Sequence, residues 1–101
     1  MSKKILIVDD DAELAEETAE ILLDYGYFVE KASDSAQGEK LIKENTYDIY
    51  LLDYKMSGLT GIELLKKVKG KNSKSIVFII TGKPFIEKIL KEENSLIRPS
   101  H

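Results

Sequence analysis

The feature that most constrains this chain is a regular alternation between short, continuously apolar runs and longer segments with helical periodicity. The apolar runs are rich in β-branched residues and cover residues 4–9, 27–32, 48–53 and 75–81. Such runs are typical of strands buried on both faces of a sheet. The helical segments cover residues 11–26, 33–46, 60–70 and 84–97. This order predicts right-handed βαβ units and a parallel sheet with helices on both faces.

Several residues indicate how the predicted helices pack and where they end. Helical spacing puts the apolar side of the first helix at Leu14, Ala15, Thr18, Ile21, Leu22 and Tyr25, and that of the third at Ile62, Leu65 and Val68. Gly26 and Gly70 stand where glycine commonly ends a helix. Gly38 weakens the second helix by about 1 kcal/mol relative to alanine.

Length, charge and cysteine content exclude several classes of function. With 101 residues the chain is long enough for one domain, which we expect to span residues 1–101. It has no cysteine, so disulfides and thiolate chemistry are excluded. A net charge of −3 argues against direct nucleic-acid binding. The apolar run over residues 5–8 is too short for a signal peptide or a membrane span, so we expect a cytoplasmic protein that does not contact a membrane.

Acidic residues stand at the ends of two predicted strands. The first run ends in Asp9-Asp10-Asp11 and the third ends in Asp53. In open parallel sheets, ligands bind outside the carboxyl ends of the strands, where the strand order reverses. If these two strands are neighbours, about 4.8 Å apart, Asp9, Asp10 and Asp53 converge. Asp11 is expected to cap the first helix instead.

Carboxylates that converge in this way suit a hard divalent cation and phosphoryl chemistry. Their mutual repulsion is relieved by an ion such as Mg²⁺, which prefers carboxylates, water and phosphate oxygens. A carboxylate is also a nucleophile toward a phosphoryl group. A nearby hydroxyl and ammonium would stabilise the phosphoryl oxygens. Thr81, at the end of the fourth apolar run, and Lys83 fit those two roles.

The ordered set of motifs resembles the receiver domain of two-component response regulators, the chemotaxis-regulator fold. The matching segments are KILIVDDD (4–11), DIYLLDYKMSGLTGIELL (48–65), VFIITG (77–82) and KPF (83–85). The resemblance implies a flavodoxin-like α/β/α fold and a role in signal transduction. It implies that Asp53 accepts a phosphoryl group from a sensor histidine kinase or a phosphotransfer protein, with Mg²⁺ as cofactor.

The resemblance also assigns roles to the surrounding positions. Asp10 would bind Mg²⁺ directly, Asp9 would do so directly or through water, and the main-chain carbonyl of Lys55 would be a further ligand beside Asp53. Thr81 would close on the phosphoryl group and Lys83 would pair with it. The only enzymatic activity implied is self-phosphorylation and autodephosphorylation at the aspartate. Ser57 departs from the family pattern, which has proline there, and this loosens the loop.

A larger departure is the single residue, Gly82, between Thr81 and Lys83, where receiver domains have about twenty. The fourth helix and fifth strand therefore look deleted, which predicts a truncated, four-stranded parallel sheet in the order 2-1-3-4. Because the ends of neighbouring parallel strands lie side by side, both residues could still reach the site. The fourth strand would become an exposed apolar edge, and a homodimer through that edge is one expected consequence.

Other interpretations of the sequence remain open. In a second alignment, residues 84–93 form a short fourth helix, residues 95–98 a remnant of the fifth strand, and Arg98-Pro99 replaces the Lys-Pro pair. The chain could also be a pseudo-receiver, an interaction or dimerisation module that keeps the acidic pocket without switching. A third alternative is a phosphatase of the haloacid dehalogenase type, whose opening motif Asp9 and Asp11 fit, although Glu13 does not.

Overall fold

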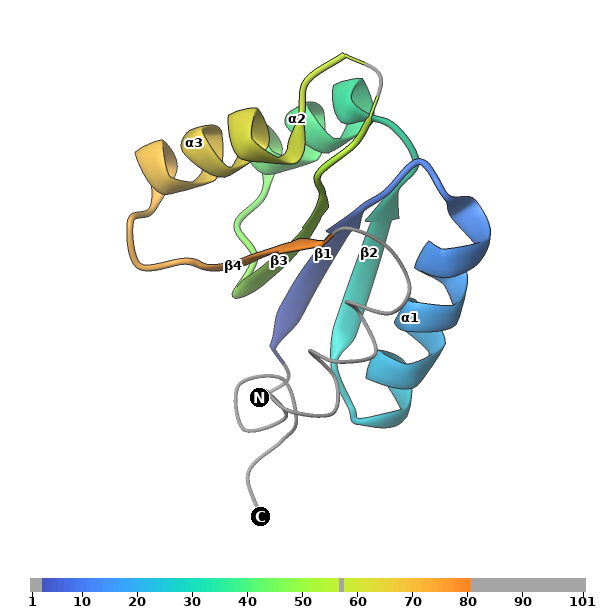
Figure 1. Ribbon diagram of the computed structural model, residues 1–101. Helices are drawn as coiled ribbons and strands as arrows, with labels where there is room; N and C mark the ends of the chain where they lie inside the picture. The colour runs from blue at the N-terminus through green and yellow to red at the C-terminus, as the bar shows by residue number, and fades with distance from the viewer. Residues whose placement is uncertain (1–2, 57, 81–101) are drawn as a thin grey trace.

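The fold is an alternating α/β arrangement, seen in a computed structural model that describes residues 3–56 and 58–80 (Figure 1). The strands are β1 (Lys4–Val8), β2 (Phe28–Ala32), β3 (Ile49–Asp53) and β4 (Ile76–Ile80). The helices are α1 (Ala12–Asp24), α2 (Ser35–Glu44) and α3 (Gly61–Lys71). Each element lies inside or within one residue of its predicted range. The helix predicted over 84–97, and the elements of the second alignment, lie outside the described residues.

The four strands form one parallel sheet in the order β2-β1-β3-β4, as predicted. The register places Ile7 of β1 between Lys31 of β2 and Leu51 of β3. At the other end of the order, Asp53 of β3 lies opposite Ile80 of β4. The strand order reverses between β1 and β3, which fixes where a site at the carboxyl edge should lie.

The central strand β1 is buried on both faces and separates two layers of core. Ile5 and Ile7 pack with apolar residues of α1, whereas Leu6 and Val8 pack with Ile42 of α2 and residues of α3. These four β1 side chains are at most 1% exposed. Burying one aliphatic side chain of this kind stabilises a fold by about 1.5–3 kcal/mol. The flavodoxin-like three-layer architecture is therefore confirmed, with α1 on one face and α2 and α3 on the other (Figure 1).

Side chains at the helix ends explain where the helices begin and stop. Asp11 is the N-cap of α1, as predicted, and its Oδ1 accepts a hydrogen bond from the Leu14 N–H at 3.0 Å. Thr60 and Glu63 form a reciprocal capping box at the start of α3. The predicted stop of this helix at Gly70 is wrong by one residue, because α3 continues to Lys71 and is capped by Asn72.

Two residues predicted on the buried sides of helices are instead exposed. Ile21 of α1 is 42% exposed and Ile62 of α3 is 38% exposed. The buried positions of α3 are Gly61, Leu64 and Val68, a narrow strip at i, i+3 and i+7. A helix lying on a sheet touches it along such a strip, so apolar residues at its border remain partly in water.

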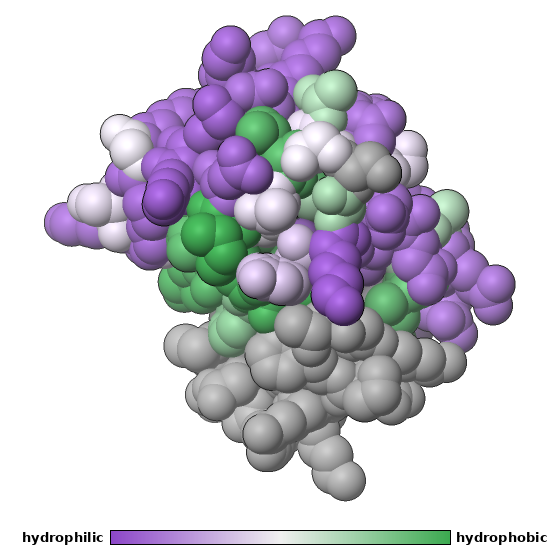
Figure 2. Space-filling model, turned by 45° about the horizontal axis from the view of Figure 1, so that its top comes forward, coloured by the Kyte–Doolittle hydropathy of each residue, from purple (hydrophilic) through white to green (hydrophobic). Residues whose placement is uncertain are grey.

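Most of the surface visible in Figure 2 is hydrophilic, with a group of apolar atoms exposed on one side.

None of the helices in residues 3–56 and 58–80 combines the length and the apolar content needed to cross a bilayer.

Candidate functional site at the carboxyl ends of β1 and β3

Three acidic side chains meet at the carboxyl edge of the sheet. Asp9 and Asp10 follow directly after β1, and Asp53 is the last residue of β3. One carboxylate oxygen from each of the three lies within 4.8 Å of the other two. The strands β1 and β3 are hydrogen-bonded neighbours although β2 separates them in the sequence. The crossover topology thus brings together acids that are more than forty residues apart.

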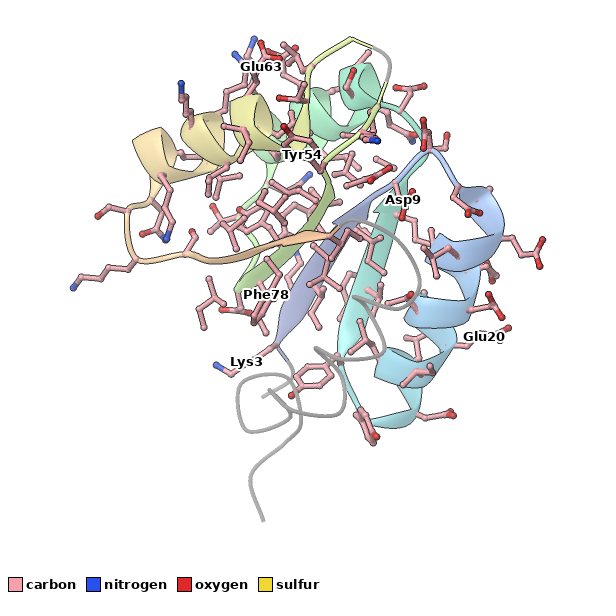
Figure 3. The ribbon with its side chains drawn as sticks, viewed as in Figure 1. Lys3, Asp9, Glu20, Tyr54, Glu63 and Phe78 are labelled. Atoms are coloured by element: carbon pink, nitrogen blue, oxygen red, sulfur yellow. The ribbon has the colours of Figure 1, made fainter. Side chains whose placement is uncertain are left out.

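The three acids differ in their exposure and in their partners. Asp9 is buried, and its Oδ1 accepts a hydrogen bond from the Asp11 N–H at 2.9 Å. Asp53 is half-buried, and its Oδ1 accepts a hydrogen bond from the Lys55 N–H at 3.3 Å. Asp10 is exposed to solvent. Figure 3 shows Asp9 at the end of β1 and Tyr54, which follows Asp53, just beyond the end of β3.

Burial and mutual repulsion shift the pKa values of two of these acids upward. Burial is the main cause that raises the pKa of Asp53 to about 7, and the negative charge of Asp9 adds to it. Burial likewise raises the pKa of Asp9, although the hydrogen bond from the Asp11 N–H opposes this shift. The folded chain therefore holds carboxylates whose ionisation is unfavourable unless a cation compensates for it.

The donor set fits a hard divalent cation. Asp9, Asp10 and Asp53 offer three carboxylate oxygens close enough together to contact one ion, and oxygen ligands are those that Mg²⁺ and Ca²⁺ prefer. The exposure of Asp10 leaves room for water molecules, which Mg²⁺ retains when it binds to proteins. A cation would also relieve the repulsion that raises the pKa of Asp53.

An open hollow lies beside the acids. It has a volume of about 440 Å³ and is lined by Asp10, Tyr54, Lys55, Met56 and Thr60. Lys55 lies near the acids, and its N–H donates a hydrogen bond to the Asp53 carboxylate. The role of its carbonyl as a metal ligand stays a prediction.

Thr81 and Lys83 both lie outside the described residues. The last described residue of β4 is Ile80, whose carbonyl accepts a hydrogen bond from the Tyr54 N–H at 2.8 Å. Ile80 is also the residue opposite Asp53 in the sheet. In sequence, Thr81 thus follows directly after the residue that pairs with Asp53, and the roles predicted for Thr81 and Lys83 remain predictions.

Close packing at Gly61 fixes the position of α3 relative to Asp53. A Cβ atom at Gly61 would lie 2.5 Å from the Asp53 carbonyl oxygen, a distance that no ordinary contact allows. The first residue of α3 can therefore approach the end of β3 only because it has no side chain. In the sequence, Gly61 belongs to the matching segment 48–65, but that pattern did not identify this contact.

Ser35 is a residue near the site that sequence reasoning missed. It is the first residue of α2, it is buried, and its Oγ accepts a hydrogen bond from the Leu59 N–H at 3.1 Å. Gly58 has a φ of +85°, and a Cβ atom there would lie 2.6 Å from the same Oγ. This contact ties the loop after Asp53 to α2 across 24 positions of sequence. The available sequence signal for this contact was Gly58, which stands two residues before Thr60, the capping residue of α3.

The fold and the acids define a class of protein: a doubly wound α/β domain with an acidic centre at the point where its strand order reverses. The sequence profile described as "Response regulator receiver domain" matches residues 5–93. The chain belongs to the response regulator receiver domain family. This match decides against the haloacid dehalogenase alternative.

Individual relatives agree with this assignment. The "Transcriptional regulatory protein DltR" of Streptococcus agalactiae is 31% identical over 80 residues, which are 79% of this chain and 36% of DltR. The chain thus spans about a third of the length of that relative. A CheY-like receiver domain protein from Methanospirillum hungatei JF-1 is 32% identical with a TM-score of 0.77, and the match covers 96% of this chain and 73% of that one.

A further solved structure shares the fold. Response regulator protein TrrA from Thermotoga maritima, crystallised in complex with Mg²⁺-BeF, superposes with a TM-score of 0.75 at 24% identity. The match covers 97% of this chain and 87% of TrrA.

Proposed function

We propose that this chain is a phosphoacceptor receiver domain, in which Asp53 accepts a phosphoryl group from a histidine kinase or a phosphotransfer protein. The observation that carries the proposal is the meeting of Asp9, Asp10 and Asp53, with ligand oxygens within 4.8 Å of one another at the β1/β3 edge. Receiver domains of response regulators, the family to which the chain belongs, interact with partners of this kind.

In the proposed transfer, a carboxylate oxygen of Asp53 forms a bond to phosphorus while the P–N bond of the donor's phosphohistidine breaks. The electron pair of that bond stays on the imidazole nitrogen, which then takes a proton from solvent. The acyl phosphate that results is the product expected of a carboxylate nucleophile. The half-exposed position of Asp53 at the end of β3, next to an open hollow, allows a donor to approach.

Mg²⁺ is the proposed cofactor, held by Asp9, Asp10 and Asp53 together with the main-chain carbonyl of Lys55. When bound, the ion would neutralise the developing charge on the phosphoryl oxygens. The structure of TrrA with Mg²⁺-BeF supports this choice of ion and of phosphoryl chemistry. Asp9 is buried and held by the Asp11 N–H, so it would present its carboxylate to the ion from a defined position.

Thr81 and Lys83 are the proposed partners of the phosphoryl oxygens. Thr81 would donate its hydroxyl hydrogen and Lys83 would contribute a positive charge. Support comes from the position of Ile80, which directly precedes Thr81 and lies opposite Asp53.

The experiment is phosphorylation by acetyl phosphate, followed by intact mass spectrometry. We expect one added phosphoryl group per chain that requires Mg²⁺, is removed by hydroxylamine and is lost in Asp53→Asn. The matched control is Asp24→Asn, which changes an exposed acid at the C-terminal end of α1, the end opposite to the one that follows Asp9 and Asp10, and should not alter the yield. A stable adduct in Asp53→Asn, or none in the native chain, would contradict the proposal.

A pseudo-receiver is the alternative that the same experiment distinguishes. The reason to consider it is the single residue, Gly82, between Thr81 and Lys83, where receiver domains have about twenty. In that case calorimetry would detect Mg²⁺ binding that depends on Asp9 and Asp10, whereas acetyl phosphate would leave no adduct on Asp53.

A further inference from the structure

We propose that β4 is a self-association edge, through which two copies of this chain pair their β4 strands antiparallel about a twofold axis. The axis would stand perpendicular to the sheet, so that the two four-stranded sheets become one continuous sheet. This interaction goes beyond the proposed phosphoryl chemistry and does not depend on it.

Among the described strands, β4 forms one end of the sheet and pairs only with β3. Its five residues, Ile76–Ile80, are all apolar. Val77, Phe78 and Ile79 are half-buried and Ile76 is 37% exposed, whereas the apolar residues of β1 are at most 1% exposed. The strand therefore has the sequence of a central strand but only part of the burial that a central strand has.

The opposite edge of the sheet, β2, is built differently. It carries Glu30 and Lys31, and the Lys31 ammonium pairs with the Glu16 carboxylate of α1. Charged residues of this kind are how natural proteins prevent edge strands from pairing with another chain. Since β4 has no charged residue, no proline and no glycine, the protection present at β2 is missing there.

The main chain of β4 suits antiparallel pairing in one register. The Ile80 carbonyl points toward β3, where it accepts from the Tyr54 N–H. Because main-chain groups alternate along a strand, the N–H and C=O groups of Val77 and Ile79 point to the outer edge. A twofold axis at Phe78 places Val77 opposite Ile79 of the second copy, so that each pair exchanges both hydrogen bonds.

The apolar character of β4 along its whole length points to a second copy of this chain as the occupant. A twofold interface requires a self-complementary surface. All five residues of β4 are apolar, so antiparallel pairing of two copies places apolar residues opposite apolar residues. No like charges oppose one another in the proposed ladder. The Ser75 carbonyl accepts a hydrogen bond from the Lys69 ammonium, so it is already satisfied and the ladder ends there. An interface this short falls below the roughly 1,200 Å² of stable complexes, so we expect a reversible dimer that depends on concentration.

The test compares two valine-to-proline variants by sedimentation velocity from micromolar to millimolar concentration. Val77→Pro removes an outward-facing N–H from β4. Val29→Pro is the matched control on β2, since the Phe28 N–H and the Ala32 carbonyl face β1 and Val29 therefore faces outward. Proline is tolerated at edge positions whose N–H faces solvent. We expect the native chain, Val29→Pro and Asp53→Asn to dimerise alike and Val77→Pro to associate at least about tenfold more weakly.

Two outcomes would overturn the proposal. One is a native chain that stays monomeric at every concentration, which would indicate that another part of the chain, such as residues 81–101, covers the edge. The other is a Val77→Pro variant that folds, by circular dichroism, and dimerises as the native chain does. Should Val77→Pro fail to fold, Ile76→Lys replaces it, because a lysine at this exposed position would face Ile80 of the second copy and should weaken the dimer.

Cross-linking provides an independent measurement, since the chain contains no cysteine. In the proposed register Phe78 lies opposite itself in a non-hydrogen-bonded pair, with Cα atoms about 4.5 Å apart. Phe78→Cys should therefore form a covalent dimer under mild oxidation, since that spacing suits a disulfide. Ile76→Cys, which is not opposite itself, should not. Equal cross-linking of the two variants would contradict the register and the twofold pairing.

Discussion

Gly38 of α2 lies directly against Val8, the last residue of β1. A Cβ atom at position 38 would stand 2.7 Å from Val8 Cγ1 and 3.0 Å from Cγ2. The absence of a side chain at Gly38 lets α2 approach the strand that leads into Asp9. The glycine that weakens this helix by its propensity is therefore needed for its packing.

We expect Gly38→Ala to destabilise the protein although alanine is the better helix former. The gain in helix propensity is about 1 kcal/mol, and overpacking costs about 1–3 kcal/mol. Urea unfolding of Gly38→Ala, Val8→Ala and the double variant measures the coupling between the two positions. We expect the double variant to be more stable than the sum of the single effects predicts. Strict additivity would show that the contact does not limit the packing.

Gly61→Ala should disturb the site as well as the fold. The added methyl group must displace either α3 or the main chain of Asp53, at a cost of about 1–3 kcal/mol. We expect weaker Mg²⁺ binding and a lower rate of phosphorylation by acetyl phosphate. Gly70→Ala in the same helix is the control, because no atom lies within 4 Å of a Cβ there. Its expected effect is a gain of up to about 1 kcal/mol with an unchanged site.

Stability without divalent cations should fall as the pH rises through the range where Asp53 titrates. The pKa of Asp53 is about 7 in the folded chain, against an ordinary value of 3.8. Between those values the folded chain keeps a proton that the unfolded chain releases, so the free energy of unfolding decreases as pH increases. Urea denaturation at about pH 5, 6, 7 and 8 would measure how the free energy of unfolding changes with pH. We expect Asp53→Asn to flatten this dependence.

Mg²⁺ should act in the opposite direction to this pH dependence. It binds the ionised carboxylates, so the stabilisation that it gives should increase from acidic to neutral pH. In the experiment without divalent cations, the contrary result is a free energy of unfolding that changes equally with pH in the native chain and in Asp53→Asn. That result would show that Asp53 does not have the raised pKa.

Lys71 of α3 should contribute to stability as a cap for α2. Its ammonium donates to the main-chain carbonyls of Ile42 at 2.8 Å, Asn45 at 2.6 Å and Lys43 at 3.3 Å. Lys71→Met keeps the aliphatic chain but removes these bonds and the favourable charge at the helix end. We expect a loss of about 1–2 kcal/mol in thermal or urea unfolding.

Lys66→Met, at an exposed position of the same helix, is the control for the loss of one positive charge. Its expected effect lies within about 0.5 kcal/mol. If the two variants lose the same stability, the contacts of Lys71 with α2 make no specific contribution.

The sequence by itself determined the elements of this protein and the positions of its acids. Apolar runs and helical periodicity are local properties, so the ranges of β1 to β4 and of α1 to α3 could be predicted within one or two residues. The handedness of βαβ units then limited the sheet to few orders, and the resemblance to receiver domains selected 2-1-3-4. Asp9, Asp10 and Asp53 could be placed at one edge because each ends, or directly follows, a predicted strand.

Only the tertiary structure decided how closely these elements approach one another. The fits of Gly38 against Val8 and of Gly61 against Asp53, and the contact of Lys71 with the end of α2, join residues that are 8 to 30 positions apart. The exposure of Ile21 and Ile62 depends on which narrow strip of a helix meets the sheet. Such contacts depend on the packing of whole elements, whose geometry no local pattern encodes. The same holds for the raised pKa of Asp53, because its causes, burial and the charge of Asp9, exist only after β1 and β3 have paired.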